Sequence, residues 1–321
     1  MCGIVGYAGK LPSTVKGQDL MAFLLLLDST RGVDGTGIYI AKVEKDVIKR
    51  EVLIKTVGNC YNLLEGRQYA KHGFDGNIAI GHNRATSVGA STRANAHPHE
   101  FGNIVGVHNG TLTQFYDNNY PGRKNMNVDS EWIYHSINER GIEQTANKMT
   151  GSWSCVWWNK AENSLNFWRN DQRPMYIMAI ASGAIIWASE KWMLNAVKDK
   201  YNLNGEVVPT VPNRLYIYAL NGNDEIELIS SDLLEGKKEP VYQSTSVSYP
   251  AKKHYPRHRV GKVLSSVPKT LPVEGGGLTC SCCGESGLLP IDIDYAYTGY
   301  EGRKYYVCRD CTAAYDYSHL Y

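Results

Sequence analysis

Strand-like and helix-like runs occur in groups over the first 230 residues of this chain, and this grouping constrains its fold more than any other feature. Strands are predicted where β-branched and aromatic residues concentrate, and helices where apolar residues recur every three or four positions. The predicted strands cover residues 36–43, 47–57, 77–82, 103–108, 152–158, 164–169, 175–180, 184–188, 214–219 and 225–229. The predicted helices cover residues 15–31, 129–149 and 190–198. Because strands follow strands without a strict strand–helix–strand order, the pattern predicts an α+β fold with packed antiparallel sheets.

The composition is that of an ordinary globular protein, with 43% hydrophobic and 21% charged residues. The formal net charge of +2 gives no overall field that would draw the chain to nucleic acid or to a membrane. The longest apolar run, at residues 21–27, is too short to cross a bilayer, and no signal-peptide pattern stands at the start. These features predict a cytoplasmic protein without membrane attachment.

The composition changes near residue 235. Residues 231–278 are rich in Pro, Ser, Lys and Tyr and lack a sustained period, which predicts a linker or extended arm. Within it, residues 249–262 gather five lysines and arginines and two tyrosines. This basic stretch is interpreted either as a solvated tether or, more sharply, as a contact for phosphate or nucleic acid.

Five of the eight cysteines crowd the C-terminal end, where their spacing suggests a metal site. Two CxxC pairs in a chain without a signal peptide favour tetrahedral zinc over disulfides. We therefore predict a zinc-ribbon-like module over residues 279–321, with strands at 288–297 and 304–307 forming a hairpin around 299–302. The predicted ligands are Cys280, Cys283, Cys308 and Cys311, with Cys282 as an alternative. Four thiolates leave no open coordination position, so the zinc would be structural.

Cys2 directly follows Met1, which makes it a candidate nucleophile. Its small side chain predicts removal of Met1, and a terminal cysteine then carries thiol and amine on one residue. The free α-amine has a pKa of about 7.7–8.0 and can accept the thiol proton near neutrality. The plainer alternative is a buried cysteine in an N-terminal strand.

Two polar loops supply the other groups that a thiolate needs in order to attack a carboxamide. Asn109 and Gly110 can donate a side-chain and a backbone N–H to a developing oxyanion. Arg84 offers a planar fork for an α-carboxylate, and Asp129, at a predicted helix start, offers an acid for an α-ammonium. Taken singly, Asn-Gly is also a common turn, Arg84 a surface ion-pair partner, and Asp129 a helix cap.

Taken together, these pieces resemble the class II glutamine amidotransferases, the N-terminal nucleophile (Ntn) hydrolase group that includes glucosamine-6-phosphate synthase and amidophosphoribosyltransferase. The matching segments, in the family order, are residues 2–6, 31–37, 81–84, 95–99 and 107–110, Asp129 with Glu131, then residues 170–175 and 188–190. The resemblance covers residues 2–230. It implies a four-layer αββα sandwich and no organic cofactor.

The resemblance also implies roles for single residues. Cys2 would be the nucleophile and its α-amine the base, with Asn109 and Gly110 in the oxyanion hole. Arg84 would bind the α-carboxylate of L-glutamine and Asp129 its α-ammonium. Further roles fall to Arg31, which would hold the N-terminal site together, and to Thr86 and Ser87 as added substrate contacts. The implied reaction forms a γ-glutamyl thioester, releases ammonia and ends in glutamate.

Departures from the family pattern leave the fate of the ammonia open. Ala85 stands where relatives carry an aromatic residue, and Val88 where sugar-amidating members carry a histidine. Residues 231–321 are also too short for a sugar isomerase or phosphoribosyltransferase domain, and they contain no Gly-rich ATP-binding loop. The leading hypothesis is an amidotransferase subunit that supplies a separate synthase or an unrecognised acceptor. The alternatives are an Ntn amidohydrolase without ammonia transfer, and a protein that binds nucleic acid or protein through the basic arm and ribbon.

Overall fold

The strand β1 (Gly3–Gly9) runs near the middle of a seven-stranded sheet, here sheet 1, in the order β11-β9-β10-β1-β4-β2-β3. A computed structural model of the chain describes residues 2–114, 126–237, 293–298 and 304–308. The other strands of sheet 1 are β2 (Gly35–Glu44), β3 (Val47–Val57), β4 (Ile78–Arg84), β9 (Tyr176–Ile180), β10 (Ala184–Ala188) and β11 (Val207–Pro209). All its strand pairs are antiparallel.

A six-stranded antiparallel sheet, sheet 2, has the order β13-β12-β8-β7-β6-β5. Its strands are β5 (His99–Phe101), β6 (Ile104–Gln114), β7 (Thr150–Asn159), β8 (Ser164–Arg169), β12 (Arg214–Leu220) and β13 (Ile226–Leu233). The predicted α+β class with antiparallel sheets is therefore confirmed, and most predicted strands agree with the structure to within two residues. The predicted strand 103–108 is the main exception, because β6 continues to Gln114.

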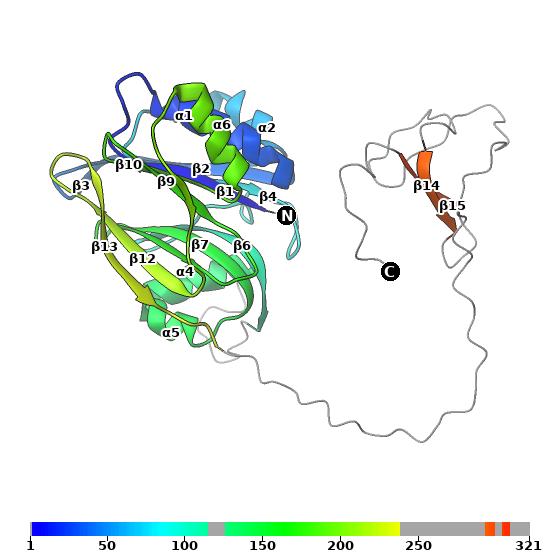
Figure 1. Cartoon of the computed structure of the whole chain (residues 1–321). Coiled ribbons are helices and arrows are strands. Elements are labelled where there is room, and N and C mark those ends of the chain that lie inside the picture. The colour runs from blue at the N-terminus through cyan, green and yellow to red at the C-terminus, as the bar shows by residue number, and fades with distance from the viewer. Residues whose placement is uncertain (1, 115–125, 238–292, 299–303, 309–321) are drawn as a thin grey trace. The chain divides into compact units, whose positions relative to one another are not determined.

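Helices cover the outer face of each sheet (Figure 1). Beside sheet 1 lie α1 (Gly17–Asp28), a 3₁₀ turn (Ser29–Arg31), α2 (Cys60–Leu64), α3 (Arg67–His72) and α6 (Lys191–Tyr201). Beside sheet 2 lie α4 (Asp129–Arg140) and α5 (Ile142–Ala146). The buried side chains of the described residues form three clusters: one between the first helices and sheet 1, one between the sheets, and one between sheet 2 and α4–α5. Three apolar interfaces separate four layers, in the order helix–sheet–sheet–helix.

The helix α1 shows why the sequence pattern predicted this packing. Leu20, Met21, Leu24 and Leu25 recur at helical spacing, and all four are fully buried against sheet 1. Burial of each such side chain contributes about 1.5–3 kcal/mol. The predicted helix over 15–31 is thus confirmed, with its last turn tightened into the 3₁₀ form.

The single helix predicted over residues 129–149 is wrong, because the chain breaks it at Gly141. Gly141 has φ +82° and ψ 168°, a backbone conformation that only glycine adopts readily, and α4 ends just before it. A short second helix, α5, follows, and Thr150 already begins β7.

The start of α4 also differs from the cap that the sequence suggested. Asp129 and Ser130 are helical residues, and the capping group is the Glu131 carboxylate, which accepts from the backbone N–H of Asn127 at 2.6 Å and of Val128 at 3.3 Å. The Asp129 side chain is therefore not needed as the cap.

The polypeptide continues with sheet 2 beyond residue 230. β13 reaches Leu233, the Leu234 carbonyl accepts from Trp168 Nε1 at 2.8 Å, and the Lys237 N–H donates to the carbonyls of Ala146 and Met149. Residues 231–237 therefore lie with the sheet and not in the arm predicted to begin at 231.

A second unit covers Gln243–Tyr321, of which two strands are described. β14 (Ile293–Thr298) and β15 (Lys304–Cys308) pair antiparallel, with Ile293 opposite Cys308. This confirms the hairpin predicted around residues 299–302. No helix in the described parts of the chain has the length and apolar character needed to span a membrane.

Candidate active site

Cys2 lies at the start of β1, where the chain passes the end of β4. Its thiol donates to the Ala85 carbonyl at 3.2 Å, and its Sγ also lies 3.3 Å from the Ala85 N–H. The next position demands glycine, because a Cβ on Gly3 would lie 1.9 Å from Oδ1 of the buried Asp28. Burial raises the pKa of the Cys2 thiol, and the Ala85 hydrogen bond and the Arg84 charge offset this only in part. The thiol therefore needs a base before it can attack.

Arg31 ties the Cys2 backbone to the rest of the sandwich. Its Nε donates to the Cys2 carbonyl at 2.9 Å, and its Nη1 forms an ion pair with Glu190. Arg31 is 9% exposed, so this contact holds the first residue of the strand from inside the protein.

Asn109 and Gly110 follow each other on β6 beside Cys2. The Asn109 Nδ2 donates to Ser189 Oγ at 2.9 Å, and the same hydroxyl accepts from the Ile4 N–H at 2.9 Å. One Asn109 N–H stays available because the amide has two. Gly110 has φ +141°, and a Cβ there would lie 2.0 Å from the Ser152 carbonyl oxygen, so the position demands glycine.

Arg84 and Asp129 meet Cys2 in a small cavity of about 20 Å³. The Arg84 Nη1 and Nη2 donate to the carbonyls of Ala90 and Val88 at 2.9 and 2.5 Å, so the guanidinium also holds the loop after β4. A second N–H on each nitrogen remains for a ligand. This space takes about one water molecule, so an amino acid can enter only if the loop moves.

The Asp129 carboxylate is held at the wall of this cavity by backbone groups. One of its oxygens accepts from the Leu112 N–H and the other from the Ser130 N–H, each at 3.0 Å. Each oxygen keeps a lone pair for a cation. Asp129 thus comes from a helix start to face Arg84, although the two are far apart in sequence.

A larger pocket of about 210 Å³ also borders Cys2. The predicted contact residues Thr86 and Ser87 line it, together with Arg31, Asn109 and Gly110. The structure thus brings all eight predicted catalytic and substrate residues to the two cavities at Cys2. It adds Thr111 and Arg173, for which the sequence predicted no role. Arg173 lies in the run 170–175 that carried the family resemblance, and this was the only signal for it.

Four buried histidines stand behind the small cavity: His82, His97, His99 and His108. The ring centroids of His82 and His97 lie 4.0 Å apart, and those of His97 and His99 lie 4.6 Å apart. Burial lowers the pKa of all four, that of His82 to about 3. The cluster is therefore neutral near pH 7. Across the described residues, no group of three or more His, Cys, Asp and Glu side chains is arranged to hold a metal ion.

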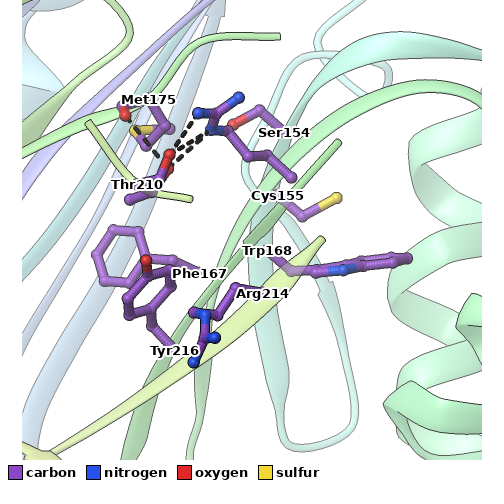
Figure 2. Close-up of a pocket in the computed structure, with 9 residues that line it drawn as sticks. Ser154, Cys155, Phe167, Trp168, Met175, Thr210, Arg214 and Tyr216 are labelled. Carbon is purple, nitrogen blue, oxygen red and sulfur yellow. Dashed lines mark hydrogen bonds between the residues drawn. The ribbon is translucent and has the colours of Figure 1, made fainter. Parts of the chain in front are cut away.

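A further hollow lies within sheet 2 and next to β11, but it has no room for water (Figure 2). Phe167 and Tyr216 fill one side of it, and Cys155 and Trp168 point away toward the helices. Thr210 is bound there by Arg169, whose Nε donates to the Thr210 Oγ1 at 2.9 Å. These contacts hold strands together, and the hollow offers no space for a substrate.

Most of the predicted zinc and nucleic-acid sites lie outside the described residues. This applies to Cys280, Cys283, Cys311 and the basic stretch 249–262, while only the backbone of Cys308 is described, at the end of β15. Both sites remain predictions.

Comparison with known proteins finds similarity to glutamine-dependent transferases. Residues 82–196 match the family described as a glutamine amidotransferase domain. Among curated proteins, glutamine–fructose-6-phosphate aminotransferase (isomerizing) of Streptococcus pyogenes is 40% identical over 119 residues, which are 36% of this chain and 17% of the relative. The Helicobacter pylori protein of the same name is 26% identical over 223 residues, or 63% of this chain and 34% of the relative. The chain thus spans about a third or less of these relatives.

Solved structures show the same fold. The match to the glutamine phosphoribosylpyrophosphate amidotransferase of B. subtilis covers 72% of this chain and 50% of the solved chain. Its TM-score is 0.53 and its sequence identity is 19%. An allosteric regulatory enzyme of purine biosynthesis gives the same coverage, a TM-score of 0.55 and 18% identity. Residues 82–196 are thus similar to a glutamine amidotransferase domain, and the helix–sheet–sheet–helix sandwich of this chain is the fold of these solved enzymes.

Proposed function

We propose that this protein hydrolyses the side-chain amide of L-glutamine through a thioester on Cys2 and supplies the ammonia to an acceptor. One observation carries the proposal: Cys2, Arg84 and Asp129, from three separate segments, line a single cavity. A thiol, a fork for a carboxylate and an acid for an ammonium are what recognition and attack of a free amino acid require.

The first half of the reaction forms the thioester. After removal of Met1, the α-amine of Cys2 takes the thiol proton, and the thiolate attacks the amide carbon. This base is needed because burial raises the pKa of the thiol. The Asn109 side chain and the Gly110 N–H stabilise the oxyanion, and the α-ammonium then protonates the leaving nitrogen, which departs as ammonia.

The second half returns the enzyme to its starting state. Water gives a proton to the α-amine and attacks the thioester carbon, again with the oxyanion facing Asn109 and Gly110. Glutamate leaves and the Cys2 thiol is restored. Arg31 keeps the attacking residue in place throughout through its contact with the Cys2 carbonyl.

Binding of glutamine orients the amide for this attack. Arg84 would hold the α-carboxylate with its free N–H groups, and Asp129 the α-ammonium with its free lone pairs, while Thr86 and Ser87 add contacts. Because the small cavity is too tight for an amino acid, we infer that the loop after β4 opens to admit glutamine and then closes over it.

The destination of the ammonia is a separate synthase or a second substrate. The relatives are named as a glutamine-dependent aminotransferase and an amidotransferase, and this chain covers only a part of them. The C-terminal cysteines would bind one structural zinc as a docking module. Metal analysis of the full chain purified without chelator should find about one zinc per chain, and a metal-free preparation would contradict this.

The experiment that tests the function combines activity with labelling. Cys2→Ala should abolish release of glutamate from glutamine, and a chloroketone analogue of glutamine should modify Cys2 in the unmodified protein. The matched control is Cys60→Ala, which removes another buried thiol that lines neither cavity. Intact-mass measurement reports whether Met1 is absent. Full activity in Cys2→Ala, or labelling at another residue, would overturn the assignment.

A further inference from the structure

Cys2 borders two different cavities, and only the small one contains the predicted contacts to the amino-acid end of glutamine. The two share Cys2, Ala85, Ser87 and Gly110. Arg84 and Asp129 line the small cavity, whereas Thr111, Arg31 and Arg173 line the larger pocket. At about 210 Å³ the larger pocket has about ten times the volume of the small cavity, enough for a small organic molecule. Of the proposed glutamine contacts, Thr86 and Ser87 line this pocket, and they leave Arg173 without a role.

The larger pocket carries one positive charge, that of Arg173, without a matching acid among the described residues. Its lining includes two arginines and three hydroxyl side chains but no Asp or Glu. Glu190 neutralises Arg31. Arg173 donates from Nη1 to the Gln172 carbonyl at 3.0 Å, and among the described residues no carboxylate is paired with it. Asp34 is close by, but its carboxylate accepts the Thr86 N–H at 2.7 Å and does not line the pocket.

We propose that this pocket binds an acceptor of the γ-glutamyl group, a small primary amine that carries an anionic group. The γ-glutamyl group would be transferred to this amine directly. Arg173 would hold the anionic group, with Thr86 and Ser87 as hydrogen-bond donors. The amine would then face the thioester, because Cys2 and both oxyanion donors line the same pocket. The inference rests on the proposed thioester and names a second fate for it.

The transfer step is balanced without any further reactant. The amine nitrogen attacks the thioester carbon, so a C–N bond forms and the C–S bond breaks. The proton lost by the amine passes to the Cys2 α-amine and then to the departing thiolate. The products are a γ-glutamyl amide and the free enzyme, and nothing is oxidised or reduced. Water and the amine thus compete for one intermediate.

The test measures this competition as the ratio of γ-glutamyl product to glutamate, by mass spectrometry, with the full-length protein. Glycine, aminomethylphosphonate and ethylamine are compared at equal concentrations of unprotonated amine. Glycine carries a carboxylate, aminomethylphosphonate carries a phosphonate, and ethylamine carries no anionic group. Both products come from the same thioester, so the ratio does not depend on how fast the thioester forms. We expect a ratio at least about tenfold higher for an anionic amine than for ethylamine, the effect of one charged hydrogen-bond pair.

Arg173→Ala should lower the ratio for anionic amines about tenfold, to the ethylamine level, and leave the ethylamine ratio unchanged. Arg50→Ala, which removes the same charge from β3 outside both pockets, should keep the preference. If the Arg173 variant does not fold, acetate provides a second measurement. In the unmodified protein it should compete with glycine and lower the glycine ratio without changing the ethylamine ratio.

Three outcomes would overturn the inference: equal ratios for ethylamine and both anionic amines, an unchanged preference in Arg173→Ala, or glutamate formation with no transfer product. A raised KM for glutamine in Arg173→Ala, without a change in the ratio, would assign the pocket to glutamine instead. Failure of the proposed function looks different, because neither glutamate nor labelling of Cys2 would then be found. A higher ratio for aminomethylphosphonate than for glycine would identify a phosphate-type acceptor.

Discussion

The two cavities that meet at Cys2 differ in size, charge and the chemistry of their walls. The small one, about 20 Å³, combines a cation and an anion, Arg84 and Asp129, and is backed by neutral histidines. The large one, about 210 Å³, is cationic and lined with hydroxyls. A site with both charges suits a zwitterion such as a free amino acid, and a cationic site suits an anion. On the proposed roles, Cys2 would serve two ligands, a glutamine that has to open its cavity and an acceptor whose pocket is already open.

The largest expected effect concerns the four buried histidines, which stand behind the small cavity and not behind the larger pocket. The unfolded pKa of histidine is about 6.5, and burial lowers the folded values below it. Stability is therefore present above about pH 6.5 and is lost as the pH falls below it, because the unfolded chain binds more protons. Four histidines would lower the free energy of unfolding by up to about 5 kcal/mol for each pH unit below this value. Burial raises the pKa of Asp28 to about 7, so the folded protein holds one more proton there than the unfolded chain, and this reduces the slope.

Urea unfolding between pH 7.5 and 4.5 measures this slope. With a stability of about 5–15 kcal/mol, the fold should be lost within about one to four pH units below 6.5. His99→Gln should flatten the slope by about 1.4 kcal/mol per pH unit, whereas His72→Gln, on α3 outside the cluster, should leave it unchanged. Equal slopes in all three proteins would show that the cluster does not control acid unfolding.

The next effect tests the oxyanion donors, which the proposed hydrolysis and transfer reactions share. Asn109→Ala removes one oxyanion donor and should lower kcat/KM for glutamine hydrolysis about 10²–10³-fold. Transfer to an amine passes through an oxyanion at the same place, so the ratio of transfer to hydrolysis should stay the same. Steady-state release of glutamate measures the first quantity and product ratios the second. Asn62→Ala, on α2, is the control. A selective loss of one product would mean that the two reactions use different oxyanion donors.

Much of the sandwich was predictable because it rests on local patterns. The alternation in β8 and the apolar face of α1 are determined by neighbouring residues, and both were predicted correctly. The break at Gly141 was missed because a glycine within an otherwise helical pattern is compatible with a continuous helix. Its positive φ belongs to the folded chain and is not revealed by the local sequence.

The candidate site was predictable in its residues but not in its geometry. The order of motifs brought Cys2, Arg84 and Asp129 together on family grounds, and the structure places them around one cavity. The contacts of Arg84 with Val88 and Ala90, and the place of Arg173 beside Thr111, depend on loop conformations. Loop conformation follows from tertiary contacts, so the division into two cavities could only be seen in the structure.

The smallest of these effects separates the two cavities most directly. Asp129→Asn keeps an oxygen for one of the two backbone N–H groups, from Leu112 and Ser130, but removes the charge that would hold an α-ammonium. Loss of one charged hydrogen bond should lower kcat/KM for glutamine about 10–100-fold, mainly through KM. The product ratio with glycine should not change, because the carboxylate of the acceptor would bind to Arg173 in the other pocket. Glu143→Gln, an exposed acid on α5, is the matched control. A changed product ratio in Asp129→Asn would mean that donor and acceptor share one site, and the contrast between the cavities would then describe two parts of a single glutamine pocket.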